Sequence, residues 1–425
     1  MKLISIVCLW SFNGLGDIIS FMKKHNNKSL PEGWTITTIQ SFEEIEHIRP
    51  VWEKMQRAQP FAVPDGDIDR YLSVLSPIKN TTQPHIIILS YNGHPEAMMI
   101  GQIGTRRIEC RIGYLTLFKP SLRWLSIVYG GILGRQDSET CTLLVEELIR
   151  TLKKGEADVV MFNHLPTDSN MYYVMRGRAS VLSRNFFPKL DIHWRMSVPE
   201  NMDVFYEKFS PKHRRNIKRC IRKLEREHRV QVKNYRHPDE LDEAITFAAK
   251  ISSRTYQHGL GCGFMDDAST RSRLTTAAHK GWLHMYILFI DDVPCAFQVG
   301  LQYEKTYFWE QTGYKPEWKQ LSIGSTLFIK VLEGFCNHSQ VASIDFGFGD
   351  AEYKQWYGNN HWPEATVSLF APRFYPILVN ALISLTRGIS LGLSWFARSI
   401  GFERWAKRGW RNVLQKNRRE EKQRR

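Results

Sequence analysis

The pattern of apolar and polar positions is clearest over residues 306–357, where it predicts a strand, a turn, a helix and a second strand. Residues 306–311 are β-branched and aromatic, as expected of a buried strand. From Ser325 onward, apolar residues recur at intervals of three and four, which is typical of a helix. These apolar positions are Leu327, Phe328, Val331, Leu332 and Phe335. Residues 341–346 form the second predicted strand, which runs into the glycine-rich segment 347–350.

The chain before this stretch shows the same mixture of patterns. Residues 34–39 alternate as a short strand, and apolar stripes over 41–52 and 141–152 predict helices. Asn92-Gly93 stands between two apolar runs and is the strongest short signal for a hairpin turn. We therefore expect an α/β (α+β) protein, with mixed, mostly antiparallel sheets flanked by helices.

The second half of the chain repeats the plan of the first. Residues 88–101 align with residues 287–300, and with one residue of slack Leu, Pro, Ala and Gly recur at matching positions. In each half a helix precedes this hairpin, and a helix and a strand follow it. Chance similarity of two hairpins is the alternative. The matching order of the flanking elements favours two tandem α/β domains, over residues 34–195 and 196–372.

A strongly basic helix is predicted at residues 211–228, early in the second domain. Ser210 suits an N-cap and Pro211 suits the first helical position. One face of this helix is apolar and the rest is crowded with Lys and Arg, including Arg215 and Arg219. One interpretation is a solvated helix between the two domains. The other is a platform on which Arg215 and Arg219 bind a phosphate-bearing substrate.

The two ends of the chain differ from the rest. Residues 1–33 read as a poorly defined leader, because their apolar run lacks a clear cleavage site. Residues 373–425 begin with apolar positions at intervals of three and four, which predict an amphipathic helix, and end in a basic tail. Together these features are the two-signal pattern for an anionic membrane surface. The alternative is a helix packed on its own domain and followed by a disordered tail.

Composition narrows the class of protein and its partners. The 425 residues leave room for two or three domains, and 43% hydrophobic residues exclude wholesale disorder. A net charge of +15 favours anionic partners such as nucleotide cofactors, anionic lipid or nucleic acid. No nucleic-acid-binding module accompanies the charge, so DNA or RNA readout is not expected. Seven scattered cysteines argue against a disulfide framework and against zinc, and we expect no metal.

The turn before the helix of residues 306–357 has the chemistry of a phosphate site. Small residues ahead of a helix leave its first backbone N–H groups accessible, and the helix dipole adds positive potential there. The residues expected to cradle a pyrophosphate are Leu321, Ser322, Ile323, Gly324 and Ser325. Gln311 ends the preceding strand, and the two strands would hold the rest of the cofactor between them.

This order of strand, phosphate turn, helix and strand resembles the acyl-CoA core of the GNAT N-acetyltransferases. Three motifs resemble more specifically the CelD-like branch of that superfamily, which is associated with bacterial polysaccharide synthesis. They are Gly-Tyr-x-Pro-Glu-Trp at 313–318, Leu-Ser-x-Gly at 321–324 and Asp-Phe-Gly-x-Gly-Asp-x-x-Tyr-Lys at 345–354. The usual GNAT phosphate signature is Gln/Arg-x-x-Gly-x-Gly/Ala. It is only partly met here, because three residues instead of two separate Gln320 from Gly324. The resemblance spans roughly residues 34–372.

Acyl transfer to an amine needs a base for the amine, an acid for the thiolate and donors for the carbonyl oxygen. Glu310, near the end of its strand, is the first candidate base. Asp345 and Asp350 flank the glycine-rich segment, and Asp345 equally suits a structural role. Tyr353 and Tyr314 are candidate acids.

The resemblance also implies a functional motif without assigning individual roles. Its members are Asp345, Gly347, Gly349, Tyr353 and Lys354. Within it, Lys354 is a candidate phosphate ligand, and Gly347 and Gly349 are expected at the substrate.

We therefore expect a GNAT-type acyltransferase that takes acetyl-CoA or another acyl-CoA as co-substrate. The expected acceptor is an amino sugar of surface polysaccharide synthesis, carried on a nucleotide, a lipid or a polysaccharide. We expect a cytoplasmic protein in peripheral contact with the inner face of the cytoplasmic membrane. The layout with a basic segment before the second unit also resembles the FemAB-type transferases, which makes aminoacyl-tRNA an alternative donor. The other alternative is a non-catalytic, membrane-associated scaffold.

Overall fold

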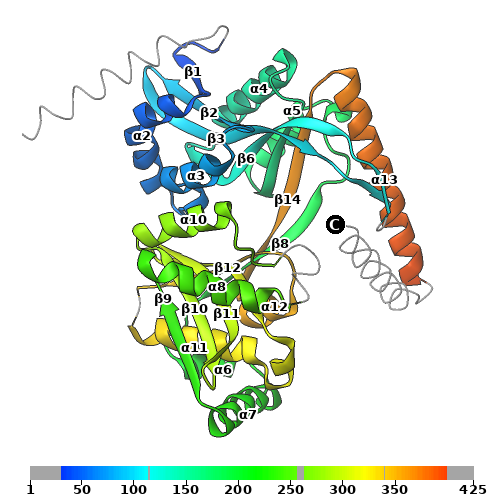
Figure 1. Ribbon diagram of the computed structural model, residues 1–425. Coiled ribbons are helices and arrows are strands. Elements are labelled where there is room, and N and C mark those ends of the chain that lie inside the picture. Colours follow the sequence, from blue (N-terminus) through cyan, green and yellow to red (C-terminus); the bar gives the residue numbers. More distant parts are fainter. Residues whose placement is uncertain (1–29, 113–114, 256–262, 339, 400–425) are drawn as a thin grey trace, which may run out of the picture. The chain divides into compact units, whose positions relative to one another are not determined.

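The computed structural model describes residues 30–112, 115–255, 263–338 and 340–399, and its contacts divide the chain into two compact units (Figure 1). Among the described residues, unit 1 comprises those up to Ile68, those of the segment Ile78–Leu190 and those from Glu364 to residue 399. Unit 2 comprises Asp69–Pro77 and Asp191–Pro363. Most of the expected leader and the basic tail beyond residue 399 lie outside the described residues.

Unit 1 is built on strands in the order β1-β2-β3-β6-β7-β14. They are β1 (Trp34–Ile39), β2 (Thr82–Tyr91), β3 (His94–Arg107), β6 (Ser121–Gly134), β7 (Val159–Pro166) and β14 (Asn360–Phe370). Neighbouring strands are antiparallel except β6 and β7, and β14 pairs with β7 through Glu364–Phe370. The short strands β4 (Cys110–Ile112) and β5 (Leu115–Phe118) pair separately.

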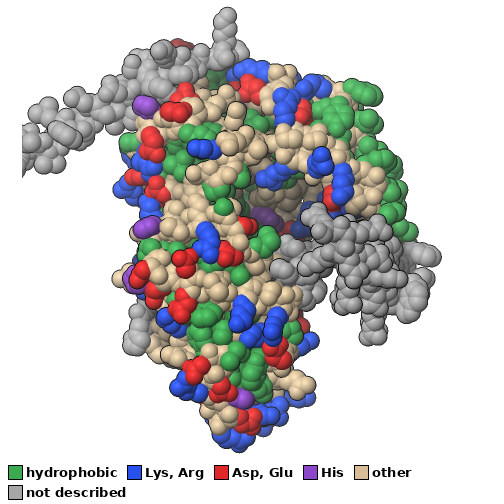
Figure 2. All heavy atoms as spheres, in the orientation of Figure 1, with side chains coloured by type: hydrophobic (Ala, Val, Ile, Leu, Met, Phe, Trp, Pro, Cys, Tyr) green, Lys and Arg blue, Asp and Glu red, His purple; other side chains and the backbone are tan. Residues whose placement is uncertain are grey.

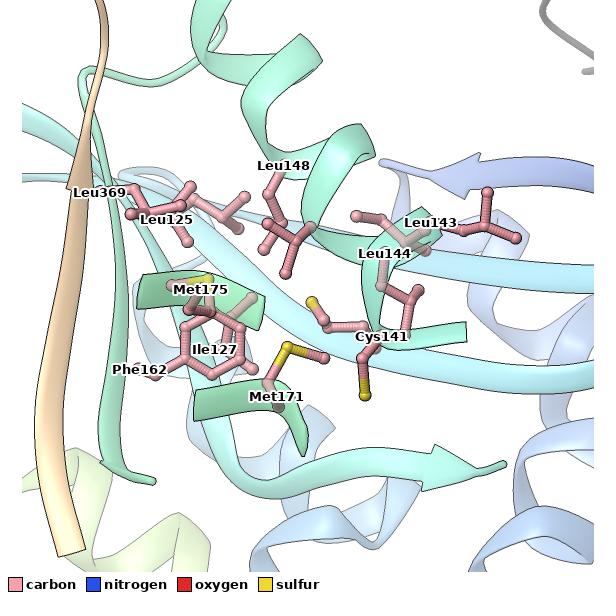
Figure 3. Packing of buried hydrophobic residues seen from close by; sticks show 14 of the residues in the cluster. Leu125, Ile127, Cys141, Leu143, Leu144, Leu148, Phe162, Met171, Met175 and Leu369 are labelled. Atoms are coloured by element: carbon pink, nitrogen blue, oxygen red, sulfur yellow. The ribbon is translucent and has the colours of Figure 1, made fainter. Parts of the chain in front are cut away.

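Helices of unit 1 cover its sheet and enclose its core. They are α2 (Phe42–Arg57), η1 (Pro64–Gly66), α4 (Ser138–Lys154), α5 (Asn170–Arg178), η3 (Val181–Ser183) and α13 (Phe374–Ser399). Figure 3 shows Leu148 of α4 and Met175 of α5 among the buried side chains around Leu125 and Ile127 of β6. The apolar stripe predicted for α4 therefore faces the sheet, as a half-buried helix requires.

Unit 2 has strands in the order β8-β13-β12-β11-β10-β9. They are β8 (Lys189–Ser197), β9 (Val230–Tyr235), β10 (Leu283–Ile290), β11 (Val293–Tyr303), β12 (Thr306–Tyr314) and β13 (Ser343–Phe348). Neighbours are antiparallel except β12 and β13, which run parallel. The predicted strands of residues 306–357 are β12 and β13.

Unit 2 also contains a segment from the first part of the chain. This segment holds most of α3 (Ile68–Leu75) and of the short turn η2 (Ser76–Ile78). The other helices are α6 (Met202–Glu207), α7 (Pro211–Glu227), η4 (Pro238–Glu240), α8 (Leu241–Ser252), α10 (Ala268–His279), η5 (Pro316–Leu321), α11 (Ile323–His338) and α12 (Glu352–Tyr357). As predicted, the Ser210 side chain caps α7, accepting from the backbone N–H of His213 at 3.3 Å.

The two units repeat one plan down to an irregularity in the first hairpin. In unit 1 the register passes from the pair Leu89–Ala97 to Ser90–Pro95. In unit 2 it passes from Leu288–Ala296 to Phe289–Pro294, which places a bulge at the matching position. The predicted fold class, with tandem α/β halves and a C-terminal helix, is confirmed.

Candidate functional site

A cavity opens in unit 2 where β12 and β13 part. The two strands pair only over their first residues, up to Phe308 and Asp345. β12 then continues to Tyr314, and a cavity of about 540 Å³ lies against its far end. Its walls come from β12, η5, the start of α11 and the short helix α12. A parting of parallel strands beside a helix N-terminus gives a slot for an extended ligand with an anionic end.

The N-terminus of α11 is open at this cavity. Gly324 and Ser325 lie in the cavity wall, and the first turn of the helix contains no acidic residue. Ser322 precedes the helix with a φ of 50°, which turns the chain sharply into it. Accessible N–H groups and the helix dipole therefore favour an anion here. Lys319, from η5, adds a positive charge to the same wall.

The rest of the predicted phosphate turn is divided between the core and a second, smaller cavity. Ile323 is fully buried, and Leu321 packs against the core of unit 2. Ser322 lines a cavity of about 110 Å³ between α7 and α11. This cavity shares Ser325 and Tyr357 with the larger one, so α7 borders the same helix N-terminus.

Aromatic side chains form the inner wall of the larger cavity. Trp309 stacks on Phe328 with ring centroids 5.1 Å apart, and Phe328 stacks on Tyr357 at 4.4 Å. Tyr353 lies 5.8 Å from Trp309, and burial raises its pKa to about 12. Its hydroxyl is therefore protonated at neutral pH and available as a donor. Tyr314, the other predicted acid, stands at the mouth and is more exposed.

Two buried polar atoms on β12 have no hydrogen-bond partner among the described residues. They are Nε1 of Trp309, which lines the cavity, and Oε1 of Gln311. Buried polar groups in proteins are nearly always satisfied, so each such atom suggests a ligand or a water. Gln311 thus remains a candidate for contact with the cofactor. Together with the open helix end, these atoms fit an acyl-CoA, whose pantetheine arm carries amides and whose pyrophosphate is anionic.

Glu310, the first predicted base, lies in a bulge of β12 and is held by two arginines. The register of β11 and β12 passes from Val299–Gln311 to Gly300–Trp309, which leaves Glu310 outside the regular pairing. Arg70 of α3 and Arg273 of α10 both form ion pairs with its carboxylate, Arg273 at 2.9 Å. Burial tends to raise the pKa of Glu310, but the two arginines outweigh it and lower the pKa.

The arginine pair was not predicted from the sequence. Arg70 precedes Glu310 by 240 positions, and its guanidinium is buried. Only the folded chain brings α3 to β12. A doubly paired carboxylate with a lowered pKa is a weak proton acceptor at neutral pH.

Asp345 belongs to a buried polar cluster at the base of the glycine-rich segment. One of its oxygens lies 2.7 Å from Nε2 of His193 and accepts from the N–H of Gly347 at 2.8 Å. Arg195 donates to its other oxygen at 3.3 Å. His193 stacks on Trp362 with centroids 4.4 Å apart. These contacts match the structural role considered for Asp345 in the sequence. His193 and Arg195, on β8, were not predicted.

Gly347 and Gly349 shape the turn that leaves β13. Both have positive φ values, of 63° and 92°, that other residues rarely adopt. Lys354 is buried and donates through Nζ to the carbonyl oxygen of Phe348, so it supports this turn from inside. Burial lowers the pKa of Lys354 to about 8, although Asp345 and Asp191 act in the opposite direction. Asp350 lies at the surface and accepts from Nε1 of Trp194 and from Gln355.

The basic helix α7 presents its charged face to solvent. Ile217, Cys220 and Leu224 are buried on the other face. The charged side chains line an open hollow of about 630 Å³: Arg214, Arg215, Lys218, Arg219, Arg222, Lys223 and Arg226. Arg215 and Arg219, predicted to bind substrate, are thus grouped on one surface. No group of three or more His, Cys, Asp or Glu that could hold a metal occurs within the described ranges.

Comparison with known proteins concerns the part of the chain that holds the cavity. Residues 211–355 match the family model of the acetyltransferase (GNAT) domain. The prediction of a GNAT-type acyltransferase is thereby confirmed at the level of the domain. No curated protein matches the chain.

Solved structures are similar over most of the chain, at low sequence identity. FemX is 9% identical, with a TM-score of 0.53, and the match covers 76% of this chain and 96% of FemX. A tandem GNAT protein from the clavulanic acid biosynthesis pathway is 10% identical, with a TM-score of 0.46. That match covers 80% of this chain and 99% of the other. L-PGS from Bacillus licheniformis is 15% identical, with a TM-score of 0.41, over 69% of this chain and 86% of that one. At 9% identity, the similarity to FemX shows the fold of this chain and nothing about its substrate.

Proposed function

We propose that unit 2 transfers an acyl group, most simply acetyl, from acyl-CoA to an amine. The observation that carries this proposal is the cavity at the parting of β12 and β13, which ends at the open N-terminus of α11. Donor and acceptor specificity remain part of the proposal. The match of residues 211–355 supports the donor class.

The donor would lie along β12 with its pyrophosphate at α11. The N–H groups of Gly324 and Ser325 would bind the pyrophosphate, with Lys319 beside them. Nε1 of Trp309 lines the cavity and would bind an amide group of the pantetheine arm, and we propose Oε1 of Gln311, two residues along β12, as a second contact. When bound, acyl-CoA supplies an activated acyl group as a thioester. The aromatic wall around Trp309 excludes water from this group, which limits hydrolysis.

Proton transfer is assigned to one side chain of the cavity wall and to one exposed carboxylate on the segment that leaves β13. Tyr353 holds its proton at neutral pH, because burial raises its pKa to about 12, and we propose it as the acid for the departing thiolate. Tyr314 is the alternative at the mouth. Among the carboxylates, Asp350 is exposed, whereas Glu310 and Asp345 are held by arginines. We therefore propose Asp350 as the acceptor of the amine proton, and Glu310 and Asp345 as positioning residues.

The acceptor we propose is an amino sugar carried on a phosphate, in bacterial surface polysaccharide synthesis. The CelD-like motifs at 313–318, 321–324 and 345–354 motivate this substrate class. The hollow on α7 offers Arg215 and Arg219 to a diphosphate, and α7 borders the N-terminus of α11. A nucleotide sugar, a lipid-linked sugar and a polysaccharide share this chemistry. We propose a location on the inner face of the cytoplasmic membrane.

Aminoacyl-tRNA is a second candidate donor, favoured by the same row of cations on α7. A row of Arg and Lys along a helix also suits a nucleic-acid backbone. The two donors make different demands on α11, because only a pyrophosphate needs its open N-terminus.

The test is an assay of thiol release from acetyl-CoA with a panel of free, nucleotide-linked and lipid-linked amino sugars. Gly324→Asp places a carboxylate at the helix end, and Gly334→Asp makes the same change at an open site on the same helix. We expect acceptor-dependent thiol release by the wild type and by Gly334→Asp, and none by Gly324→Asp. The alternative result is no thiol release together with transfer from aminoacyl-tRNA that salt weakens steeply. It would show that aminoacyl-tRNA, and not acyl-CoA, is the donor. If folded protein shows neither thiol release nor transfer from aminoacyl-tRNA, the result would favour the non-catalytic scaffold.

A further inference from the structure

The C-terminal helix α13 packs on unit 1 through both polar and apolar side chains, with Val379 and Ile383 in a hydrophobic cluster, and it exposes other apolar side chains outward. Asn380 is 1% exposed and donates to the backbone carbonyls of Leu182 and Arg184, both at 2.9 Å. Thr386 is also buried. On the outer side, Phe374 is 84% exposed and Leu385 60% exposed. One side of α13 is therefore packed on its own domain, as in the alternative considered from the sequence, while the other side is apolar and exposed.

The outward side chains form a continuous stripe along α13. Phe374, Leu378, Leu385 and Ile389 are exposed and recur at intervals of four and seven residues. At 3.6 residues per turn these positions share one face of a helix. Figure 2 shows hydrophobic side chains along the edge of the molecule where Figure 1 places α13. Such a stripe on a soluble domain is the mark of an interaction surface.

Two further segments of unit 1 extend the stripe. Leu115, Leu117 and Phe118 of β5 are exposed, and β4, the partner of β5, contacts α13 through a hydrogen bond from Ser390 to the carbonyl of Arg111. Residues 181–190, which hold the acceptor carbonyls for Asn380, expose four more large apolar side chains besides Leu182. We call residues 115–118, 181–190 and 374–393 together the apolar surface.

The charges around the apolar surface are predominantly positive. Residues 105–119, 181–190 and 373–399 contain nine Lys or Arg and a single acidic residue, Glu109. Arg111 and Lys119 are more than half exposed beside β4 and β5, and both form ion pairs with Glu109, so this cluster keeps a net charge of one positive unit. The chain continues for residues 400–425 with ten Lys or Arg and three Glu. An apolar face bordered by cations is complementary to an anionic bilayer.

We propose that the apolar surface lies in the interfacial layer of an anionic lipid bilayer, with α13 parallel to the membrane. The apolar stripe would enter the boundary between headgroups and acyl chains, and the flanking Lys and Arg would meet the lipid phosphates. A second copy of this chain is a weaker occupant, because it would bring the same positive charges together. The 20 residues Phe374–Leu393, with a mean hydropathy of 1.4, are long and apolar enough to cross a membrane. The bonds of Asn380 and Ser390 instead hold the helix along unit 1.

The experiment is co-sedimentation of the full chain with vesicles of phosphatidylcholine, with and without phosphatidylglycerol. We expect binding to the anionic vesicles that falls with salt, and weak binding to the neutral ones. Leu385→Glu with Ile389→Glu should weaken binding at least about tenfold, since each places a carboxylate in the interface. The control is Val293→Glu in unit 2, which replaces another exposed apolar side chain and should leave vesicle binding unchanged. Titration with acetyl-CoA should give the same result for all of these proteins.

Four results would overturn the proposal. The first is absence of wild-type binding to anionic vesicles. The second is equal binding by the Leu385, Ile389 double variant. The third is a lipid-free dimer that the double variant converts to monomer, because the surface would then be an interface between copies. The fourth is vesicle-bound protein that resists extraction at alkaline pH, because α13 would then span the bilayer.

Discussion

Unit 1 and unit 2 place six strands in the same order, but they differ at the helix that follows the parting of their parallel strands. In unit 1 this helix is α4, and the Asp137 side chain closes its N-terminus by accepting from the N–H of Thr140 at 2.9 Å. Glu139 adds a second acid to the first turn. In unit 2 the helix is α11, whose first turn has no acid and faces a cavity. The same position in the fold is therefore capped by an acid in unit 1, where Arg135 pairs with Asp137 and Glu139, and lacks an acid in unit 2, where we propose the anion site.

The strands that precede these helices also differ: the irregular part of β6 is covered, whereas β12 borders a cavity. The irregularity in β6 of unit 1 is covered by Val63, and a Cβ atom added at Gly130 would meet Cγ2 of Val63 at 1.8 Å. In unit 2 the bulge in β12 holds Glu310, and the cavity lies against the neighbouring residues of the strand. The two units thus share the arrangement of the sheet, while the proposed ligand site depends on a few side chains at one helix end.

The largest expected effect concerns the proposed acid in α12. Tyr353→Phe should lower turnover by roughly 10²–10⁴-fold with little change in acyl-CoA affinity, because it removes a proton donor and keeps the ring. Steady-state kinetics on an acceptor found by the thiol assay would measure this. Tyr172→Phe in α5, the helix at the same place in unit 1, should leave turnover unchanged. Equal losses in the two variants would show that the units do not divide the chemistry as we propose.

A second difference is the buried lysine behind the glycine-rich turn of unit 2. Burial lowers the pKa of Lys354 to about 8 from an ordinary value of 10.5, so the unfolded chain binds the proton more tightly between these values. Stability should therefore rise with pH across this window and stay level below pH 8. The rise attributable to Lys354 is on the order of 3 kcal/mol. Urea unfolding at several pH values would measure it.

Lys354→Met is the matched variant for this pH dependence. It keeps much of the buried volume and removes the titrating group, so its stability should lack the rise that the wild type shows between pH 8 and 10.5. Parallel pH profiles for the two proteins would mean that Lys354 is solvated in solution, contrary to its burial in unit 2.

The smallest expected effect lies in unit 1. Asp137→Ala should cost about 1 kcal/mol of stability through loss of the helix cap. It should leave acetyl-CoA binding at one site per chain, because Val63 still covers the neighbouring strand. Calorimetric stoichiometry and urea unfolding give both quantities, and Asp137→Asn should retain most of the stability. A second acetyl-CoA site in Asp137→Ala would show that the cap alone separates the units.

Local patterns predicted the frame of the site well. The stretch 306–357 forms β12, α11 and β13 in the expected order, and the repeated hairpins share a bulge. Gly324, Ser325, Tyr314 and Tyr353 all line one cavity, because they lie within one strand–helix–strand unit and the short helix that follows it. Contacts between neighbours in sequence follow from periodicity and turn chemistry, which a single sequence contains.

Long-range contacts were out of reach for the same reason. Arg70 reaches Glu310 across 240 positions, and His193 reaches Asp345 across 152. No spacing rule links such pairs, so the sequence predicted Glu310 as a candidate base and not as the partner of two arginines. The orientation of α13 was equally hidden, because periodicity defines two faces of a helix but not which one meets the domain.

The central claim is that an acyl-CoA site exists in unit 2 at the N-terminus of α11. The most direct measurement is calorimetric titration of the wild type, Gly324→Asp and Gly334→Asp with acetyl-CoA. We predict saturable binding at one site by the wild type and by Gly334→Asp. We predict loss of at least about 100-fold in affinity for Gly324→Asp, from repulsion between its carboxylate and the pyrophosphate. Unchanged binding by folded Gly324→Asp, or no binding by folded wild type, would contradict the claim.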